Sequence, residues 1–211
     1  MISIKRRDVI CGIFSGLAMT SLTSKAARSE LKSHEGNNYN NSNREVLLNC
    51  ETTRCGNGCM DLKNDRIISL ACIELIDTEV TGRFYHLPYQ KEFPCFDHYQ
   101  SSRIADEIRD FIGITPPVAF NARFEMGFVN MEMERLGIEK IDTPCTDIVA
   151  LARKIWPSEP CYLAAIAQRL HIEFRLLDDE TPENTLYDAG VMAECYGQIG
   201  RMQNVIKDKT A

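Results

Sequence analysis

The segment LLNCETTRCGNG, residues 47–58, joins an apolar run to a polar, glycine-containing end. Residues 46–48 are a valine and two leucines, and they lead directly into Asn49 and Glu51. A buried strand presents acidic residues at its end in this way, for instance to hold a metal ion, and side chains two apart in a strand point to the same face. One of the two positions where a carboxylate is expected is an asparagine. The segment leaves three interpretations open: a working metal site, an altered one, or none.

The composition indicates one acidic globular domain. The chain has 211 residues, of which 44% are apolar, enough to bury one good core. It carries 30 Asp and Glu against 24 Lys and Arg, a net charge of −6. Nucleic-acid-binding proteins are more often basic, so such a partner would have to meet a local positive patch. The acidic balance also suits a protein that gathers carboxylates around divalent cations.

Residues 1–26 have the layout of a secretory signal peptide. Arg6 and Arg7 form a basic start, residues 9–19 are apolar, and small residues surround Ala26. The arginine pair favours the twin-arginine type of signal, and the apolar run is shorter than the roughly 20 residues that span a bilayer. We expect export, to the periplasm; the alternative is a basic amphipathic tail that stays in the cytosol.

The rest of the chain divides into a linker, a domain and a tail. Residues 27–43 are polar and rich in Asn and Ser, which predicts a disordered linker before a folded domain over residues 44–201 and a tail over 202–211. Of nine cysteines, removal of Cys11 with the leader leaves eight, an even number that permits disulfides in an exported protein. Cys72 and Cys195 lie in apolar periodic segments and are expected to be buried thiols.

Hydrophobic periodicity predicts strands first and then helices mixed with a strand. We expect an antiparallel meander followed by α/β structure on a mixed sheet. The expected strands are residues 45–50, 66–75, 81–87 and 116–121, and the expected helices are residues 103–113, 123–137, 143–157, 161–170 and 181–200. Thr181 is expected to cap the last helix, with Pro182 at its first position.

Three further acidic candidates, Glu125, Glu183 and Asp188, come from the expected helices, although an acidic residue on a helix is usually a solvated charge. Four segments, VLLNCETT, FNARFEMGFVNMEMERLG, KIDTPCTDIVALARKIWP and LYDAGVMAECY, follow one another from about residue 44 to 200. In order and spacing they resemble the four-carboxylate (DEDD-type) 3'–5' exonucleases, nearest the proofreading epsilon subunits of bacterial replicative DNA polymerase. The resemblance implies a ribonuclease-H-like fold of about five strands flanked by helices, two Mg²⁺ or Mn²⁺ ions, and a single-stranded DNA or RNA 3' end as substrate.

The first motif of that family reads Asp-x-Glu followed by Thr-Thr-Gly. Here the positions are Asn49, Cys50, Glu51, Thr52, Thr53 and Arg54. The resemblance implies metal ligation at Asn49 and Glu51, a catalytic role for Glu51, and contact with the terminal nucleotide at Thr52, Thr53 and Arg54. An amide oxygen can bind Mg²⁺ but cannot neutralise it. Arg54 replaces a glycine, and it either binds phosphate or blocks close backbone approach.

The second motif, His-Asn-Ala-x-Phe-Asp, matches residues 120–125. Glu125 replaces the aspartate with a longer carboxylate and is implied as a metal ligand. The resemblance places Asn121 and Phe124 at the substrate, with packing as the alternative for Phe124.

In the third motif a histidine precedes the last aspartate by five residues. Asp188 stands at the aspartate position, implied as a catalytic residue and metal ligand, and Glu183 stands at the histidine position. The histidine of the family deprotonates the attacking water, and its pKa near 6.5 suits that task. A glutamate is a weaker base unless its surroundings raise its pKa. Glu183 either takes that catalytic role or supplies the charge lost at Asn49.

Two functions from different classes remain. One is a metal-dependent 3'–5' exonuclease with impaired or altered catalysis, and the other is an inactive exonuclease-fold module that binds nucleic acid or a protein partner. Residues 88–102 are shorter than the corresponding segment of the polymerase subunits and lack its His-Gly-Ile-Thr stretch, which leaves the preference for DNA or RNA open. A polymerase-associated cytosolic proofreader is a third possibility, against which the leader argues.

Overall fold

The computed structural model describes residues 43–53, 61–87, 101–175 and 184–210. Residues 44–211 belong to one compact unit. The leader and the linker expected before residue 44 lie outside the described residues, so export stays a prediction. Among the described helices, none combines the length and the apolar character that crossing a bilayer requires.

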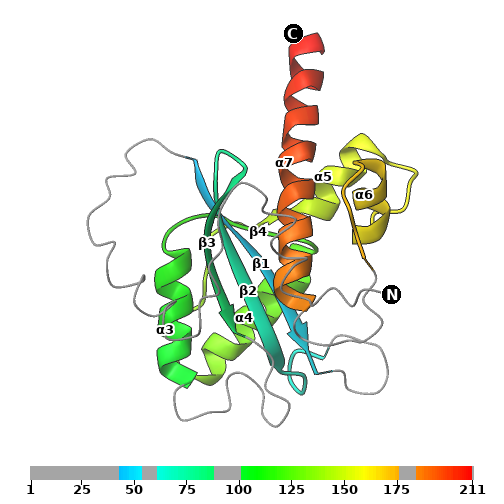
Figure 1. The fold of residues 1–211 in the computed structure, drawn as a ribbon. Helices are drawn as coiled ribbons and strands as arrows, with labels where there is room; N and C mark the ends of the chain where they lie inside the picture. The colour runs from blue at the N-terminus through cyan, green and yellow to red at the C-terminus, as the bar shows by residue number, and fades with distance from the viewer. Residues whose placement is uncertain (1–42, 54–60, 88–100, 176–183, 211) are drawn as a thin grey trace, which may run out of the picture. The chain divides into compact units, whose positions relative to one another are not determined.

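A five-stranded mixed sheet forms the centre of this unit (Figure 1). The antiparallel meander predicted from the sequence is confirmed, because β2 pairs with both β1 and β3 in antiparallel fashion. The order across the sheet is β3-β2-β1-β4-β5, with β4 parallel to β1 and β5 parallel to β4. The strands are β1 Arg44–Thr52, β2 Ile67–Ile76, β3 Glu79–Leu87, β4 Pro117–Ala119 and β5 Thr146–Asp147.

Strand β1 lies in the middle of the sheet with neighbours on both sides. Its residues 46–50 are all buried, which explains the continuous apolar run that precedes Asn49. Because β4 runs parallel to β1, both strands end at the same edge of the sheet, where the chain continues into the segments that carry the candidate site.

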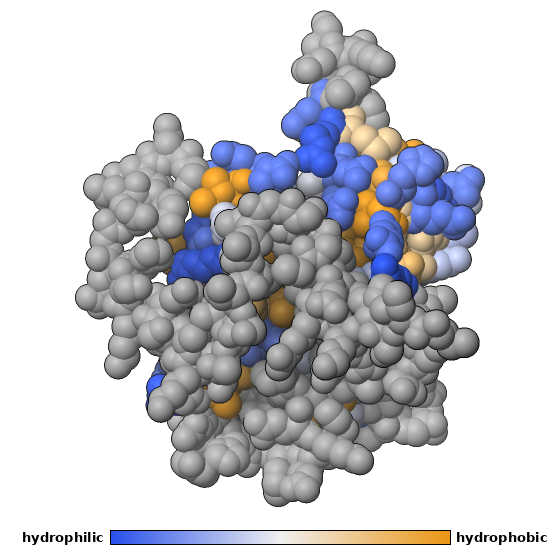
Figure 2. Space-filling model, viewed as in Figure 1, coloured by the Kyte–Doolittle hydropathy of each residue, from blue (hydrophilic) through white to orange (hydrophobic). Residues whose placement is uncertain are grey.

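Helices cover both faces of the sheet (Figure 1). On one face α3 packs through Phe111, whose ring lies 6.3 Å from that of Tyr85, and α4 contacts β1 and β2. On the other face α7 crosses the three antiparallel strands, and α5 and α6 pack against α7. The helices are α3 Ser101–Ile112, α4 Ala122–Arg135, α5 Ile148–Ile155, α6 Leu163–Arg169 and α7 Asn184–Thr210. Hydrophobic residues are visible where α7 meets α5 and α6, with hydrophilic residues around them (Figure 2).

Two elements differ from the sequence prediction. The expected helix over residues 143–157 begins only at Ile148, because Thr146 and Asp147 pair with β4 as a short strand. The Asp147 carboxylate then caps α5 by accepting hydrogen bonds from the backbone N–H groups of Val149 and Ala150. Helix α7 continues to Thr210, through the residues assigned to a tail.

The buried face of α4 also differs from the expected one. Helical spacing in the sequence predicts a face made of Phe124, Phe128, Met131 and Arg135. The side chains that α4 buries are instead Glu125, Phe128, Val129, Glu132 and Met133. Two of the five buried positions are glutamates, so apolar periodicity could not identify this face. Each of these glutamates has a hydrogen-bonding role of its own.

A buried glutamate on β2 fastens α3 to the sheet. Glu74 is 2% exposed and accepts hydrogen bonds from Arg44 Nε at 2.7 Å and Arg83 Nη1 at 2.9 Å. Arg44 also donates to the backbone carbonyls of Phe111 and Ile112 at the end of α3. This cluster lies at the start of β1, the opposite end of that strand from Asn49 and Glu51.

Candidate active site

Asn49 ties the last part of β1 to the first turn of α7. Its side chain is 4% exposed, and its Nδ2 donates a hydrogen bond of 2.9 Å to the backbone carbonyl of Thr185. A carboxylate has no donor and could not make this bond. The asparagine that sequence analysis identified as the altered ligand therefore also has a structural role.

Glu125 lies on α4 and reaches the chain beside Asn49. It is 4% exposed, and its Oε2 accepts a hydrogen bond of 2.8 Å from the backbone N–H of Cys50. Burial raises the pKa of Glu125 to about 8, the negative charge of Glu51 adds to the rise, and the hydrogen bonds from Cys50 oppose it. Glu125 and Glu51 are thus close enough to repel one another.

Asp188 reaches the same place from α7. Burial, followed by the negative charge of Glu51, raises the pKa of Asp188 to about 6. Glu51, which is half-buried near the end of β1, therefore interacts with a carboxylate from α4 and with one from α7. The Asn49–Thr185 and Cys50–Glu125 hydrogen bonds join α7 and α4 to this end of β1, and Glu51 lies within electrostatic range of both Glu125 and Asp188.

This donor set fits a hard divalent cation. Carboxylate and amide oxygens are the ligands that Mg²⁺ and Mn²⁺ prefer, and a cation among these side chains would favour the ionised forms of Glu125 and Asp188, which burial and, to a lesser extent, the charge of Glu51 disfavour. Among the residues that the structure describes, no three Asp, Glu, His or Cys side chains are grouped tightly enough to hold a metal ion as they stand. Glu183, the fourth acidic candidate, lies outside the described residues.

The predicted substrate residues that the structure describes lie in two places, the start of α4 and the end of β1. Asn121 is exposed at the start of α4 in a left-handed conformation, φ 70° and ψ 68°, and its N–H donates to Asp147 Oδ1 at 3.3 Å. Phe124 is half-buried, with its ring 4.9 Å from that of Phe128 in an edge contact, so packing accounts for at least part of its role.

The other substrate candidates follow Glu51. Thr52 ends β1, and Thr53 exchanges two hydrogen bonds of 2.8 Å with the backbone of Arg66. Arg54 lies outside the described residues.

Sequence reasoning missed the polar residues that support the site. Glu132 and Asp147 were counted only as parts of helices, although each accepts several hydrogen bonds from groups near the site. The one available signal was spacing, because Glu132 follows Glu125 by seven residues, or about two helical turns. Burial also lowers the pKa of His86 to about 4, and its Nε2 has no hydrogen-bond partner among the residues that the structure describes.

The raised pKa of Glu125 predicts a pH-dependent stability. A group whose pKa is higher in the folded state stabilises the fold below its unfolded pKa, and that contribution is lost as the pH rises through the folded value. We expect the melting temperature of the metal-free protein to fall between about pH 5 and pH 8, and Glu125→Gln to melt higher than the wild type at pH 8 because it cannot ionise. Melting curves in a chelator at constant ionic strength measure this.

Asp188→Asn is the matched control, because the pKa of Asp188 is raised only to about 6. The melting temperature of Asp188→Asn relative to the wild type should stop changing by about pH 7. That of Glu125→Gln should still be rising relative to the wild type toward pH 8. Equal pH profiles for the wild type and Glu125→Gln would contradict the prediction.

The chain is similar in sequence to the DNA polymerase III subunit epsilon of several bacteria. It is 30% identical to that of Salmonella typhimurium over 174 residues, which cover 72% of this chain and 70% of the relative. It is 29% identical to the Escherichia coli protein with the same coverage, and 27% identical to the Rickettsia conorii protein over 195 residues, 80% of each chain. No family model matches.

Solved structures show the same fold. The nuclease domain of 3'hExo, a DEDDh family member bound to rAMP, superposes with a TM-score of 0.56 and 12% identity over 80% of this chain and 95% of that one. Exonuclease X in complex with 5'-overhanging duplex DNA gives a TM-score of 0.50 and 16% identity over 76% and 93%. The expected ribonuclease-H-like fold is confirmed. Sequence and fold together place this chain in the family of the DNA polymerase III epsilon subunit, among the DEDD-type 3'–5' exonucleases.

Proposed function

We propose that this protein removes nucleotides from the 3' end of single-stranded nucleic acid by hydrolysing the terminal phosphodiester, more slowly than a site with all four carboxylates. The observation that supports the proposal is that α4 and α7 both bond to the end of β1 that carries Glu51, α4 through Glu125 and α7 through the Asn49–Thr185 bond, with Asn49 in place of the fourth carboxylate. Membership of a 3'–5' exonuclease family supports the reaction type.

Each of these residues has a distinct task in the proposed reaction. Glu51, Glu125 and Asp188 would hold Mg²⁺ or Mn²⁺, and the side-chain oxygen of Asn49 would be a weak fourth ligand. A divalent cation held there would act as a Lewis acid toward the phosphodiester. Glu125 would have to lose its proton before it could bind a cation, because its pKa is near 8 without one.

The remaining candidates would bind and orient the substrate. Thr52 and Arg54 follow Glu51 in the chain and would approach the terminal nucleotide, together with Asn121 and Phe124 at the start of α4. The Thr53 hydroxyl already accepts a hydrogen bond from the Arg66 N–H, so Thr53 would act through its backbone position. Glu183 is the candidate base for the attacking water.

One observation favours the inactive module as a second candidate. Asn49 uses its amide to join β1 to α7, a bond that stabilises the fold and contributes nothing to metal binding. In an inactive module that only binds nucleic acid or a protein partner, this structural hydrogen bond would be a sufficient role for Asn49. Metal binding separates the two functions, since a ligand that binds only the folded state raises the melting temperature. The exonuclease is expected to show such a rise with Mn²⁺, and the inactive module is not.

The decisive experiment uses the full chain with 5'-labelled single-stranded DNA and RNA of one sequence, in Mg²⁺ and then in Mn²⁺. We expect stepwise shortening from the 3' end that disappears in the chelator. Glu51→Ala, purified identically, is the control for contaminating nuclease. Shortening at the same rate in wild type and Glu51→Ala, or none in either, would refute the exonuclease.

A further inference from the structure

We propose that Arg66, Glu132 and Arg135 hold Glu51 in position. None of the three is among the proposed metal ligands. We call them the arginine–glutamate cluster. The inference rests on the proposed function, because it concerns the geometry of the same site. It assigns a catalytic consequence to residues that touch neither the substrate nor the proposed metal.

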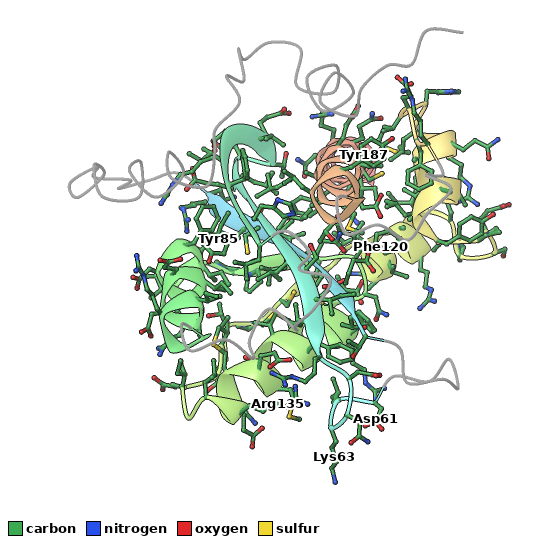
Figure 3. All side chains as sticks on the ribbon, turned by 60° about the horizontal axis from the view of Figure 1, so that its bottom comes forward. Asp61, Lys63, Tyr85, Phe120, Arg135 and Tyr187 are labelled. Atoms are coloured by element: carbon green, nitrogen blue, oxygen red, sulfur yellow. The ribbon has the colours of Figure 1, made fainter. Side chains whose placement is uncertain are left out.

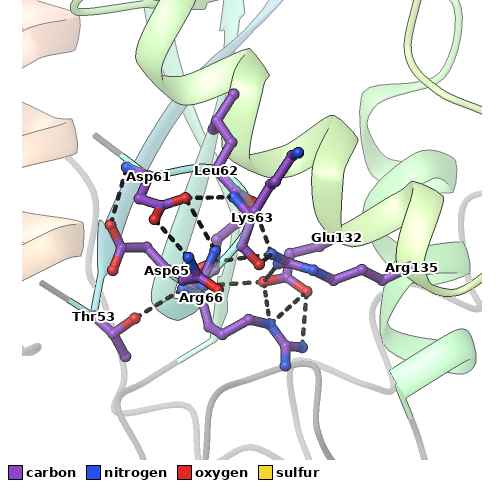
Figure 4. Close-up of polar contacts among 10 residues, drawn as sticks. Thr53, Asp61, Leu62, Lys63, Asp65, Arg66, Glu132 and Arg135 are labelled. Carbon is purple, nitrogen blue, oxygen red and sulfur yellow. Dashed lines mark hydrogen bonds and ion pairs between the residues drawn. The ribbon is translucent and has the colours of Figure 1, made fainter. Parts of the chain in front are cut away.

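Glu132 is the centre of the cluster and is 0% exposed (Figure 4). It accepts hydrogen bonds of 2.9 Å from Arg66 Nε, Arg66 Nη2 and Arg135 Nη1, and one of 3.2 Å from the backbone N–H of Ile67. Arginine suits this role because its planar guanidinium can give a carboxylate two hydrogen bonds at once. A buried carboxylate so fully bonded fixes the two arginines firmly relative to α4.

Arg66 links Glu132 to the residue that directly follows β1. Its backbone carbonyl accepts from the Thr53 N–H at 2.8 Å, and its own N–H donates to Thr53 Oγ1 at 2.8 Å. Thr53 stands two residues after Glu51. The chain that follows Glu51 is therefore held by Glu132 through Arg66.

The chain that precedes Glu51 is held by the same helix. Cys50, the residue before Glu51, donates its backbone N–H to the carboxylate of Glu125. Glu125 lies on α4, seven residues before Glu132. Seven residues make about two turns, so Glu125 and Glu132 lie on one face of α4. Helix α4 thus fixes the backbone on both sides of Glu51, once through Glu125 and once through the cluster.

Arg135 attaches the chain that leads into β2. Its Nη2 donates to the backbone carbonyls of Leu62 at 2.7 Å, Lys63 at 2.9 Å and Asp65 at 3.3 Å. Figure 3 shows Arg135 beside Asp61 and Lys63, at the end of the sheet where β2 begins. With this segment held, Arg66 cannot shift along β2 without breaking bonds at Arg135 as well.

The molecule contains a matched cluster that lacks this connection. Glu74 is 2% exposed and is likewise bonded to two arginines, Arg44 and Arg83, but it joins β2 to α3 and β3 at the far end of β1. Loss of either glutamate charge should destabilise the fold. Only the loss at Glu132 should disturb Glu51, so Glu74→Gln is the control for a purely structural effect.

The test compares Glu132→Gln with Glu74→Gln in the full chain, at a temperature where both are folded. We expect Glu132→Gln to lower kcat about tenfold with little change in KM, to weaken Mn²⁺ binding about tenfold in a melting titration, and to speed amide exchange at Glu51 and Thr53. Glu74→Gln should change none of these three. A second pair avoids the risk of unfolding: Arg66→Lys should retain more Mn²⁺ affinity than Arg66→Met.

Two outcomes would overturn the inference. One is an equal effect of Glu132→Gln and Glu74→Gln on Mn²⁺ affinity and kcat, and the other is unchanged amide exchange at Glu51 and Thr53 in Glu132→Gln. If the proposed function is wrong, the wild type itself will show no nuclease activity, so this result is distinguishable from a failure of the positioning role. The exchange rates at Glu51 and Thr53 decide the positioning role even then.

Discussion

The Asn49→Asp variant is expected to be less stable than the wild type without metal and to bind Mn²⁺ more tightly. An ionised aspartate cannot donate to the Thr185 carbonyl, and its charge would add to that of Glu51, which together with burial already raises the pKa values of Glu125 and Asp188. The lost hydrogen bond and the buried charge should lower the free energy of unfolding by about 2 kcal/mol in chelator. A fourth anionic ligand should tighten Mn²⁺ binding at least about tenfold and raise nuclease activity by a similar factor.

Melting curves in chelator and across a Mn²⁺ titration measure both effects on one sample, since bound metal stabilises the folded state by mass action. Asn49→Ala is the control: it removes the same hydrogen bond without adding a charge, so it should lose stability and gain no metal affinity. An Asn49→Asp variant with the metal affinity of the wild type would contradict the prediction. It would point instead to a charge already supplied from elsewhere, as the sequence suggests for Glu183.

Glu132→Ala is expected to cause the largest loss of stability of any single change considered for this protein. It removes the carboxylate that Arg66 and Arg135 share, and those side chains are only 21% and 22% exposed. Breaking a buried ion pair by removing one partner costs about 3–5 kcal/mol, and the partial exposure of the arginines favours the lower end. We expect a loss of about 3 kcal/mol, measured by urea denaturation, and a melting temperature lower by about 6–12 °C.

Glu134→Ala, two residues further along the same helix, is the matched control. Glu134 pairs with Lys140 at 2.8 Å, but the side chains are 55% and 48% exposed. Exposed pairs contribute about 0–1 kcal/mol, so this variant should unfold at nearly the wild-type urea concentration. Similar losses in the two variants would show that Glu132 is not held as tightly as its hydrogen bonds indicate.

Much of the fold could be predicted from the sequence because apolar periodicity reports burial directly. Strands β1 to β3 and the positions of α3, α4 and α6 followed from it within a few residues. The pattern fails where polar groups are buried. Glu125 and Glu132 occupy core positions of α4, and Thr146 and Asp147 form a strand only because β4 lies beside them.

The candidate site shows the same division. Asn49 and Glu51 could be paired by strand alternation, and resemblance to a family added Glu125 and Asp188. The bond from Asn49 to Thr185 joins residues 136 positions apart, and the cluster around Glu132 joins residues 66 positions apart. Nothing in a local pattern encodes such distant partners, which depend on how the elements pack.

Helix α7 has a practical consequence for work on this protein. It begins beside the site with Thr185 and Asp188 and runs to Thr210, and Figure 1 shows its last turns projecting beyond the sheet. At 1.5 Å per residue its 27 residues measure roughly 40 Å. A purification tag, a fluorophore or a surface tether attached at the end of α7 would lie about that distance along the helix from the candidate site. The C-terminal end is therefore the place to immobilise the protein for single-molecule or surface-based assays.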